Sequence, residues 1–105
     1  MLYELRIYYT HPGRLQAICD RFANLTLGIF PSHGIKVTEF WVDAASKNAI
    51  YYLCEFADEQ AQKAAWDSFE HDPVWIAGKA ASEADGPIVE RIESYNMIRA
   101  EFFTK

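Results

Sequence analysis

The chain has 105 residues, of which 50% are hydrophobic, 15% aromatic and 24% charged. This length fits a single domain over residues 1–105, and the apolar content excludes intrinsic disorder. The formal net charge of −5 argues against nucleic acid or an anionic membrane as a partner, because both are bound by clustered Lys and Arg.

Targeting and metal-binding motifs are not found in the sequence. A charge stands at Glu4 before any long apolar run, so a secretory signal is not expected, and no run approaches the roughly 18 apolar residues of a membrane span. Cys19 and Cys54 form no C-x-x-C pair, and the three histidines lack the spacing of metal ligands. We therefore expect a cytoplasmic protein with buried reduced thiols, no metal and no cofactor.

The chain begins with a predicted strand and a predicted helix. Residues 2–9 alternate between an odd-numbered face of tyrosine, leucine and isoleucine and an even-numbered face with Glu4, Arg6 and Tyr8. From residue 14 the period becomes helical, with an apolar stripe about 120° wide. Its members are Leu15, Ile18, Cys19, Phe22, Leu25 and Ile29, whereas Leu27 and Phe30 fall outside it. Gly34 is the predicted left-handed cap.

The rest of the chain repeats these elements in a different order. Residues 35–42 and 49–56 are predicted strands joined by a short polar linker at 43–48. Asp58 is the expected N-cap of the next helix, which breaks at residues 71–73 and resumes from 74 to 84. Residues 88–98 form the last predicted strand. The order βαββαβ predicts an α+β, ferredoxin-like fold with an antiparallel sheet and both helices on one face.

Both faces of this predicted sheet carry bulky side chains. Simple alternation places Ile35, Val37, Glu39 and Trp41 on one side of their strand, and Lys36, Thr38, Phe40 and Val42 on the other. Because two helices cover only one face, we expect the other face to meet a second copy of the chain. The space between the two sheets is then a cavity lined in part by Glu4, Arg6, Tyr8 and Glu39. A small-molecule pocket and a satisfied buried ion pair both fit this composition.

Several short motifs resemble those of the NIPSNAP family. They are Tyr3-Glu4-Leu5-Arg6-Ile7-Tyr8, Pro12-Gly13-Arg14-Leu15, Phe30-Pro31-Ser32-His33-Gly34-Ile35, Ala65-Trp66-Asp67-Ser68-Phe69 and Asp72-Pro73-Val74-Trp75. Each motif is modest, but their order and spacing are fairly specific, and together they extend from about Tyr3 to Met97. The resemblance implies a dimeric α+β barrel, in agreement with the two-faced strands. It implies little about activity.

Three candidate site residues lie at the ends of the predicted helices. His33 could act as a general acid or base at the mouth of the cavity, or it could bond the last carbonyls of its helix. Asp72 and Trp75 could supply a carboxylate and an aromatic wall to a ligand site. Alternatively, Asp72 caps the resumed helix, Pro73 takes its first position and Trp75 packs in the core.

The remaining candidates lie on the predicted strands. Arg6 and Tyr8 could hold a carboxylate or an enolate, or Arg6 could pair with Glu4 or Glu39 across the sheet. Trp41 and Tyr52 could contribute to ligand recognition or only to packing.

Two functions from different classes are consistent with these residues. The first is a homodimer that binds a small organic ligand in a barrel cavity. It could be a cofactor-independent enzyme of monooxygenase, isomerase or cyclase type, in which Arg6 and Tyr8 steady an oxyanion and His33 moves a proton. The alternative is a non-catalytic protein-interaction module.

Overall fold

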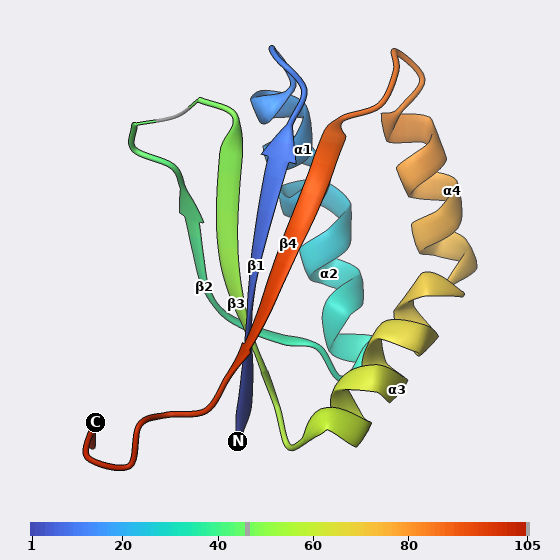
Figure 1. Ribbon diagram of the computed structural model, residues 1–105. Helices are drawn as coiled ribbons and strands as arrows, with labels where there is room; N and C mark the ends of the chain where they lie inside the picture. The colour runs from blue at the N-terminus through green and yellow to red at the C-terminus, as the bar shows by residue number, and fades with distance from the viewer. Residues whose placement is uncertain (46, 105) are drawn as a thin grey trace.

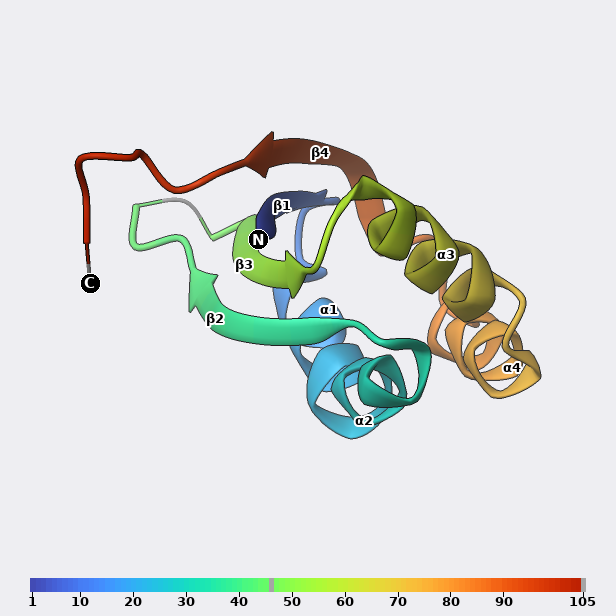
Figure 2. The ribbon, with the colours of Figure 1, turned by 90° about the horizontal axis from the view of Figure 1, so that it is seen from below.

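The computed structural model describes residues 1–45 and 47–104, which form a four-stranded antiparallel sheet with the helices on one face (Figures 1 and 2). The strand order is β2-β3-β1-β4, with β1 Leu2–Thr10, β2 Lys36–Val42, β3 Ala49–Phe56 and β4 Val89–Met97. The helices are α1 Leu15–Arg21, η1 Phe22–Thr26, α2 Leu27–Ile29, η2 Phe30–His33, α3 Glu59–Glu70 and α4 Pro73–Ser82. The predicted α+β class and βαββαβ order are confirmed.

The helix boundaries follow the predicted capping residues. Gly34 ends η2 with a φ of 78°, in the left-handed region that favours glycine. The Asp58 side chain accepts from the Ala61 N–H at the start of α3. Ser46, in the predicted linker, and Lys105, at the end of the predicted domain, lie outside the described residues. Among the described residues, no helix is both long and apolar enough to cross a lipid bilayer.

The first helical segment contains a π turn that the sequence pattern did not predict. In η1 the N–H of Leu27 bonds the carbonyl of Phe22, five residues back, as in a π-helix. In this wider turn each residue rotates about the helix axis by less than the ordinary 100°. Residues four positions apart therefore stay on the face of the helix that meets the sheet. Thr26 and Phe30 are therefore only 2% and 1% exposed. The expectation that Phe30 lies outside the core stripe is wrong.

A bulge in β2 changes which of its residues share a face. Val37 is paired with Cys54 and Glu39 with Leu53, so Thr38 is the extra residue between them. Val37 packs against the core, whereas Glu39 and Trp41 are exposed. Simple alternation had placed all three on one face, and that assignment is wrong because the bulge shifts the period by one residue.

The two faces of β1 are also used in the opposite sense from that predicted. Glu4 and Tyr8 are buried, and with Arg6 they contact the helices rather than the open face of the sheet. The cavity expected between two sheets therefore does not contain these residues. The helices cover the more polar face of β1, because side chains of α3 supply hydrogen-bond donors for Glu4.

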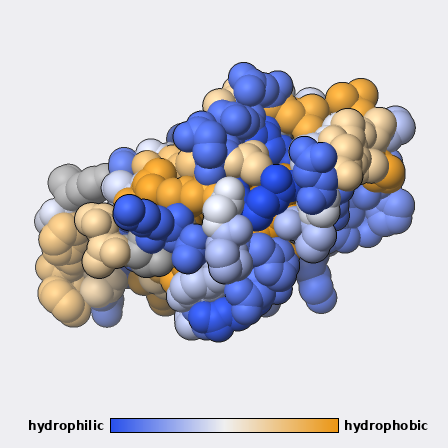
Figure 3. All heavy atoms as spheres, turned by 90° about the horizontal axis from the view of Figure 1, so that it is seen from above, coloured by the Kyte–Doolittle hydropathy of each residue, from blue (hydrophilic) through white to orange (hydrophobic). Residues whose placement is uncertain are grey.

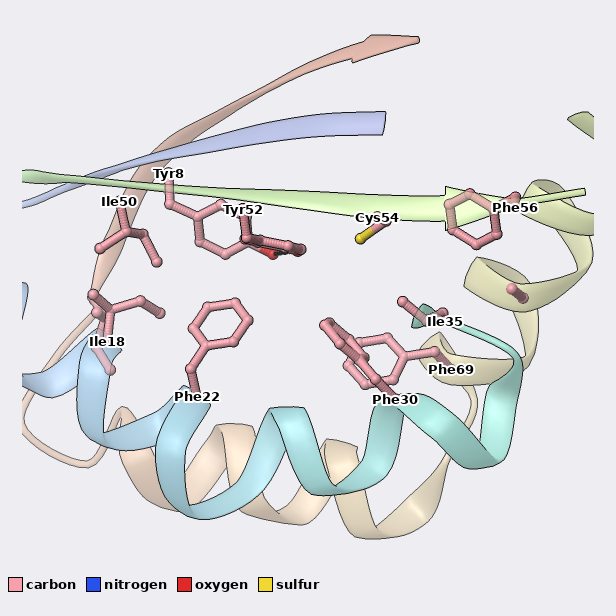
Figure 4. Packing of buried hydrophobic residues seen from close by; sticks show 12 residues of the cluster. Tyr8, Ile18, Phe22, Phe30, Ile35, Ile50, Tyr52, Cys54, Phe56 and Phe69 are labelled. Atoms are coloured by element: carbon pink, nitrogen blue, oxygen red, sulfur yellow. Dashed lines mark hydrogen bonds between the residues drawn. The ribbon is translucent and has the colours of Figure 1, made fainter. Parts of the chain in front are cut away.

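The core lies between the sheet and the helices and is dominated by aromatic rings (Figure 4). Tyr8 and Tyr52 project from the strands toward Phe22 and Phe30 on the helical segment. The rings of Phe30 and Phe69 meet edge to face with centroids 5.0 Å apart, an arrangement that adds to the stability gained by burial. Both cysteines are free. Cys54 is buried as predicted, and Cys19 is half-buried.

Candidate functional site

A buried carboxylate on β1 organises a polar network beneath the sheet. Glu4 is 2% exposed, and its Oε1 accepts hydrogen bonds from Gln62 Nε2 and Trp66 Nε1 of α3, each at 2.7 Å. Its Oε2 accepts from Ser94 Oγ of β4 at 2.6 Å and from Arg6 Nη1 at 3.0 Å. The carboxylate is thus bonded from two strands and one helix, which meets the requirement that a buried charge be paired.

Arg6 lies at the centre of this network. Its Nε donates to the Tyr52 hydroxyl at 2.8 Å and its Nη2 to the Tyr8 hydroxyl at 3.3 Å. The two hydroxyls are 3.0 Å apart. The guanidinium carbon also lies 4.2 Å from the centroid of the Trp66 ring, a cation–π contact. Of the alternatives left open by the sequence, Arg6 pairs with Glu4, and the exposed Glu39 lies on the other face.

The network determines the charge states of its members. Burial on its own raises the pKa of Glu4, but hydrogen bonds from Ser94, Trp66, Gln62 and Arg6 lower the pKa below its ordinary value of 4.5. Burial also opposes the charge on Arg6, yet the neighbouring tyrosines and Glu4 raise the pKa of this guanidinium. Burial raises the pKa of Tyr52 well above 10, so its hydroxyl stays protonated. At neutral pH the site therefore holds an anion, Glu4, beside a cation, Arg6.

A cavity of about 470 Å³ opens beside this network and is lined by residues of β1, β4, α1, α3 and α4. Arg6 and Tyr8 reach it from β1, Trp66 and Phe69 from α3, and Trp75 from α4. The other lining residues are Arg21, Glu70, Lys79, Glu83, Val89, Glu90, Arg91 and Ile92. The result is an aromatic wall with guanidinium and hydroxyl donors, a composition suited to a small organic molecule with an electron-rich oxygen.

His33 and Asp72 form a second, separate cluster. His33 Nε2 lies 2.6 Å from Asp72 Oδ2, and His33 Nδ1 lies 2.6 Å from Ser68 Oγ. The other carboxylate oxygen of Asp72 accepts from the N–H groups of Val74 and Trp75, so Asp72 caps α4 as the sequence allowed. The His33 hydrogen bond is the largest cause that lowers the pKa of Asp72. These contacts tie η2 to the α3–α4 corner, and neither His33 nor Asp72 lines the cavity.

The structure thus divides the predicted site residues among the cavity, the His33–Asp72 cluster and the open face of the sheet. Arg6, Tyr8 and Trp75 line the cavity, and Tyr52 supports Arg6 from below. Glu39 and Trp41 lie on the open face of the sheet, paired with Leu53 and Tyr51 of β3.

Sequence reasoning missed several residues of the site, among them Gln62, Trp66, Ser94 and Arg21. The signal for Trp66 was its place in a family motif. Arg21 stands directly beside the apolar stripe of the first helix, where a buried charge was not expected. Among the described residues, no group of three His, Cys, Asp or Glu side chains is placed to hold a metal ion.

Comparison with known proteins shows both a family and a fold. The NIPSNAP family profile matches residues 3–103. An uncharacterized NIPSNAP domain protein from Burkholderia xenovorans is similar with a TM-score of 0.84 and 21% identity, covering 100% of both chains. A NIPSNAP family protein with unknown function from Agrobacterium tumefaciens is similar with a TM-score of 0.84 and 21% identity, covering 98% of this chain and 91% of its own.

A more distant structure has the same fold. An antibiotic biosynthesis monooxygenase is similar with a TM-score of 0.67 and 11% identity, covering 95% of this chain and 99% of its own. No curated protein matches the chain. At these identities the structural similarities establish the fold alone.

Proposed function

We propose, since this chain belongs to the NIPSNAP family, that it acts as a homodimer in which each protomer binds a small organic ligand. The binding site is the cavity between the sheet and the α3–α4 pair. The observation that carries the proposal is a cavity of about 470 Å³ lined in part by the half-buried Arg6. This volume lies within the range of roughly 300–1,000 Å³ that is usual for small-molecule sites.

The donors at the cavity wall favour a ligand oxygen that carries negative charge. A guanidinium has more N–H groups than the three that Arg6 uses on Glu4, Tyr8 and Tyr52. Arg6 and Tyr8 both line the cavity. Trp66 and Trp75 supply flat apolar surfaces for the rest of the molecule. In a catalytic form of the proposal, Arg6 and Tyr8 would stabilise an enolate or phenolate oxygen.

Truncation of Trp75 tests the cavity. We expect Trp75→Ala to weaken ligand binding at least about tenfold, because the ring forms one wall of the cavity and truncation of a central aromatic typically costs more than about 1 kcal/mol. A thermal-shift screen against a metabolite panel would identify ligands, and calorimetry would measure their dissociation constants. Val74→Ala is the matched control, since Val74 is the adjacent residue of α4, is 61% exposed and does not line the cavity. Equal affinities in both variants would contradict the placement of the ligand.

The open face of the sheet supports the dimer. On this face Leu5 of β1 lies between its cross-strand partners Leu53 of β3 and Tyr95 of β4, and Tyr95 is 50% exposed. The next row includes Ile7, Tyr51 and Trp41. The C-terminal segment projects from the end of the sheet (Figure 1), and hydrophobic patches lie among hydrophilic surface at both ends of the view in Figure 3. Burial of this apolar area against a second sheet would be favourable, and closed twofold pairing is the commonest arrangement.

Sedimentation tests the dimer directly. We expect the protein to sediment as a dimer at micromolar concentration and Leu5→Lys to sediment as a monomer, because the new ammonium group would be buried without a partner. Val74→Lys places the same charge on an exposed position of α4 and should remain a dimer. A monomeric wild-type protein would contradict the proposal.

The second candidate function is a non-catalytic interaction module. It is favoured by apolar side chains on the C-terminal segment, where Ile98 is 78% and Phe102 is 92% exposed. The two functions differ in whether the cavity binds a small ligand. If the metabolite screen finds no cavity ligand and the dimer persists, the interaction module is the better description.

A further inference from the structure

Arg21 is a buried cation that the polar network does not include. It is the last residue of α1 and is 6% exposed. Its guanidinium carbon lies 5.4 Å from the centroid of the Trp75 ring, and the side chain lines the cavity opposite Arg6 and Tyr8. Arginine is rarely buried to this extent unless it is paired.

Arg21 has few partners among the described residues. Its one side-chain hydrogen bond runs from Nη1 to Ser82 Oγ at 3.3 Å, and its Nε is buried with no partner. No carboxylate of the described residues lies within 4.0 Å of it, although Arg6 on the opposite wall is neutralised by Glu4. A buried donor left without a partner usually has an explanation in a ligand, an ion or water.

The charges around Arg21 do not replace a partner. Glu83 is near enough to favour the charged form of Arg21, but its carboxylate bonds Lys79 Nζ at 3.1 Å. Burial is the largest influence and lowers the pKa of Arg21, which is consistent with a cation that lacks compensation. Arg21 is therefore a buried cation on the cavity wall, and no carboxylate of the described residues, including the lining Glu70, Glu83 and Glu90, forms an ion pair with it.

We infer that the cavity ligand is an organic acid and that Arg21 holds its carboxylate. This inference rests on the proposed function, because it names the ligand class for the same cavity. A carboxylate would supply the direct counter-charge that Arg21 lacks, and its two oxygens match the fork of a guanidinium. Trp75, Phe69 and Trp66 contact the apolar part of the acid. Arg6 lines the same cavity, and the N–H groups that it does not use on Glu4, Tyr8 and Tyr52 would bond a second oxygen of the ligand.

The test compares an acid with its uncharged analogue. Phenylacetate and phenylacetamide have the same shape, so calorimetric titration of both isolates the contribution of the charge. We expect the wild-type protein to bind phenylacetate at least tenfold more tightly than phenylacetamide. Arg21→Met should abolish this preference, because it weakens the binding of phenylacetate and leaves the affinity for phenylacetamide unchanged. Arg21→Lys should retain part of the preference.

Arg14→Met is the matched control. Arg14 also has a buried Nε without a partner, but its Nη2 donates to the Gly86 carbonyl and it does not line this cavity. The Arg14→Met variant should keep the full preference for phenylacetate over phenylacetamide. If Arg21→Met keeps that preference as well, Arg21 is not the anchor and the inference is wrong, while the cavity remains a ligand site. If neither compound binds, or if Trp75→Ala leaves binding unchanged, the proposed function fails and the inference fails with it.

Thermal unfolding without ligand gives a second readout. A cation held for a ligand contributes little to the free protein, so Arg21→Met should unfold at the wild-type temperature or above it. A drop of more than about 5 °C in this variant, with none in Arg14→Met, would assign Arg21 a structural role and overturn the inference.

Discussion

Replacing Glu4 by alanine is expected to lower the free energy of unfolding by about 3–5 kcal/mol, the usual cost of removing one partner from a buried ion pair. Glu4 accepts hydrogen bonds from four side chains, including those of Arg6 and Trp66. The substitution leaves the Arg6 guanidinium, whose side chain is 17% exposed, without its carboxylate. It also leaves Trp66 Nε1 of α3 without its acceptor, whereas Gln62 Nε2 still has Asn96 Oδ1.

Urea denaturation followed by circular dichroism measures this loss. Glu90→Ala is the control, because it removes an exposed carboxylate of β4 and should change the free energy of unfolding by about 0.5 kcal/mol or less. If the two variants lose equal amounts, Glu4 is not the organising group of the network.

The same measurement at low pH gives an independent check on Glu4. The pKa of Glu4 in the folded protein lies below its ordinary value of 4.5. The stabilisation it provides is therefore complete above the unfolded-state pKa and is lost as the pH falls through the folded-state pKa. Glu4→Gln removes this titration, so its stability should fall less steeply than that of the wild type below about pH 4.5. Asp72 and Glu83 also have lowered pKa values and account for the slope that remains.

Local signals in the sequence predict most of the fold. The alternation of residues 2–9 and the apolar run of residues 49–56 predict β1 and β3 to within a residue. Asp58 and Asp72 mark the starts of α3 and α4, because a short acidic side chain satisfies the first free N–H groups of a helix. These features depend on neighbours in the chain, and so they can be read without a structure.

The position of the site depends on partners that are distant in the chain. Alternation places Glu4 and Arg6 on one face, but it does not say which face the helices cover. That choice is decided by Gln62 and Trp66, which lie 58 and 62 positions from Glu4 and donate to its carboxylate. The cavity likewise requires Arg21 of α1 and Trp75 of α4, whose approach follows from tertiary packing. Arg6 and Tyr8 were therefore predicted as a pair, but on the open face of the sheet rather than on the face that the helices cover.

Phe30 gives the second large expected effect, and it depends on the π turn. The ring is 1% exposed and lies among Phe22, Tyr52, Trp66 and Phe69, with centroid distances from 5.0 to 6.2 Å. Phe30→Ala should therefore lower the free energy of unfolding by about 3–5 kcal/mol, since it removes a buried ring and leaves a cavity.

Leu27→Ala separates this role from a general effect on the same segment. Leu27 lies three residues earlier and is 38% exposed, so its truncation should cost less than about 1 kcal/mol in the same urea titration. In a regular helix both residues would lie outside the apolar stripe, and both substitutions would be mild. A large loss at Phe30 with a small loss at Leu27 is the result expected from the wider turn at residues 22–26. Similar small losses at both positions would contradict the π turn, because they would mean that Phe30 does not reach the sheet.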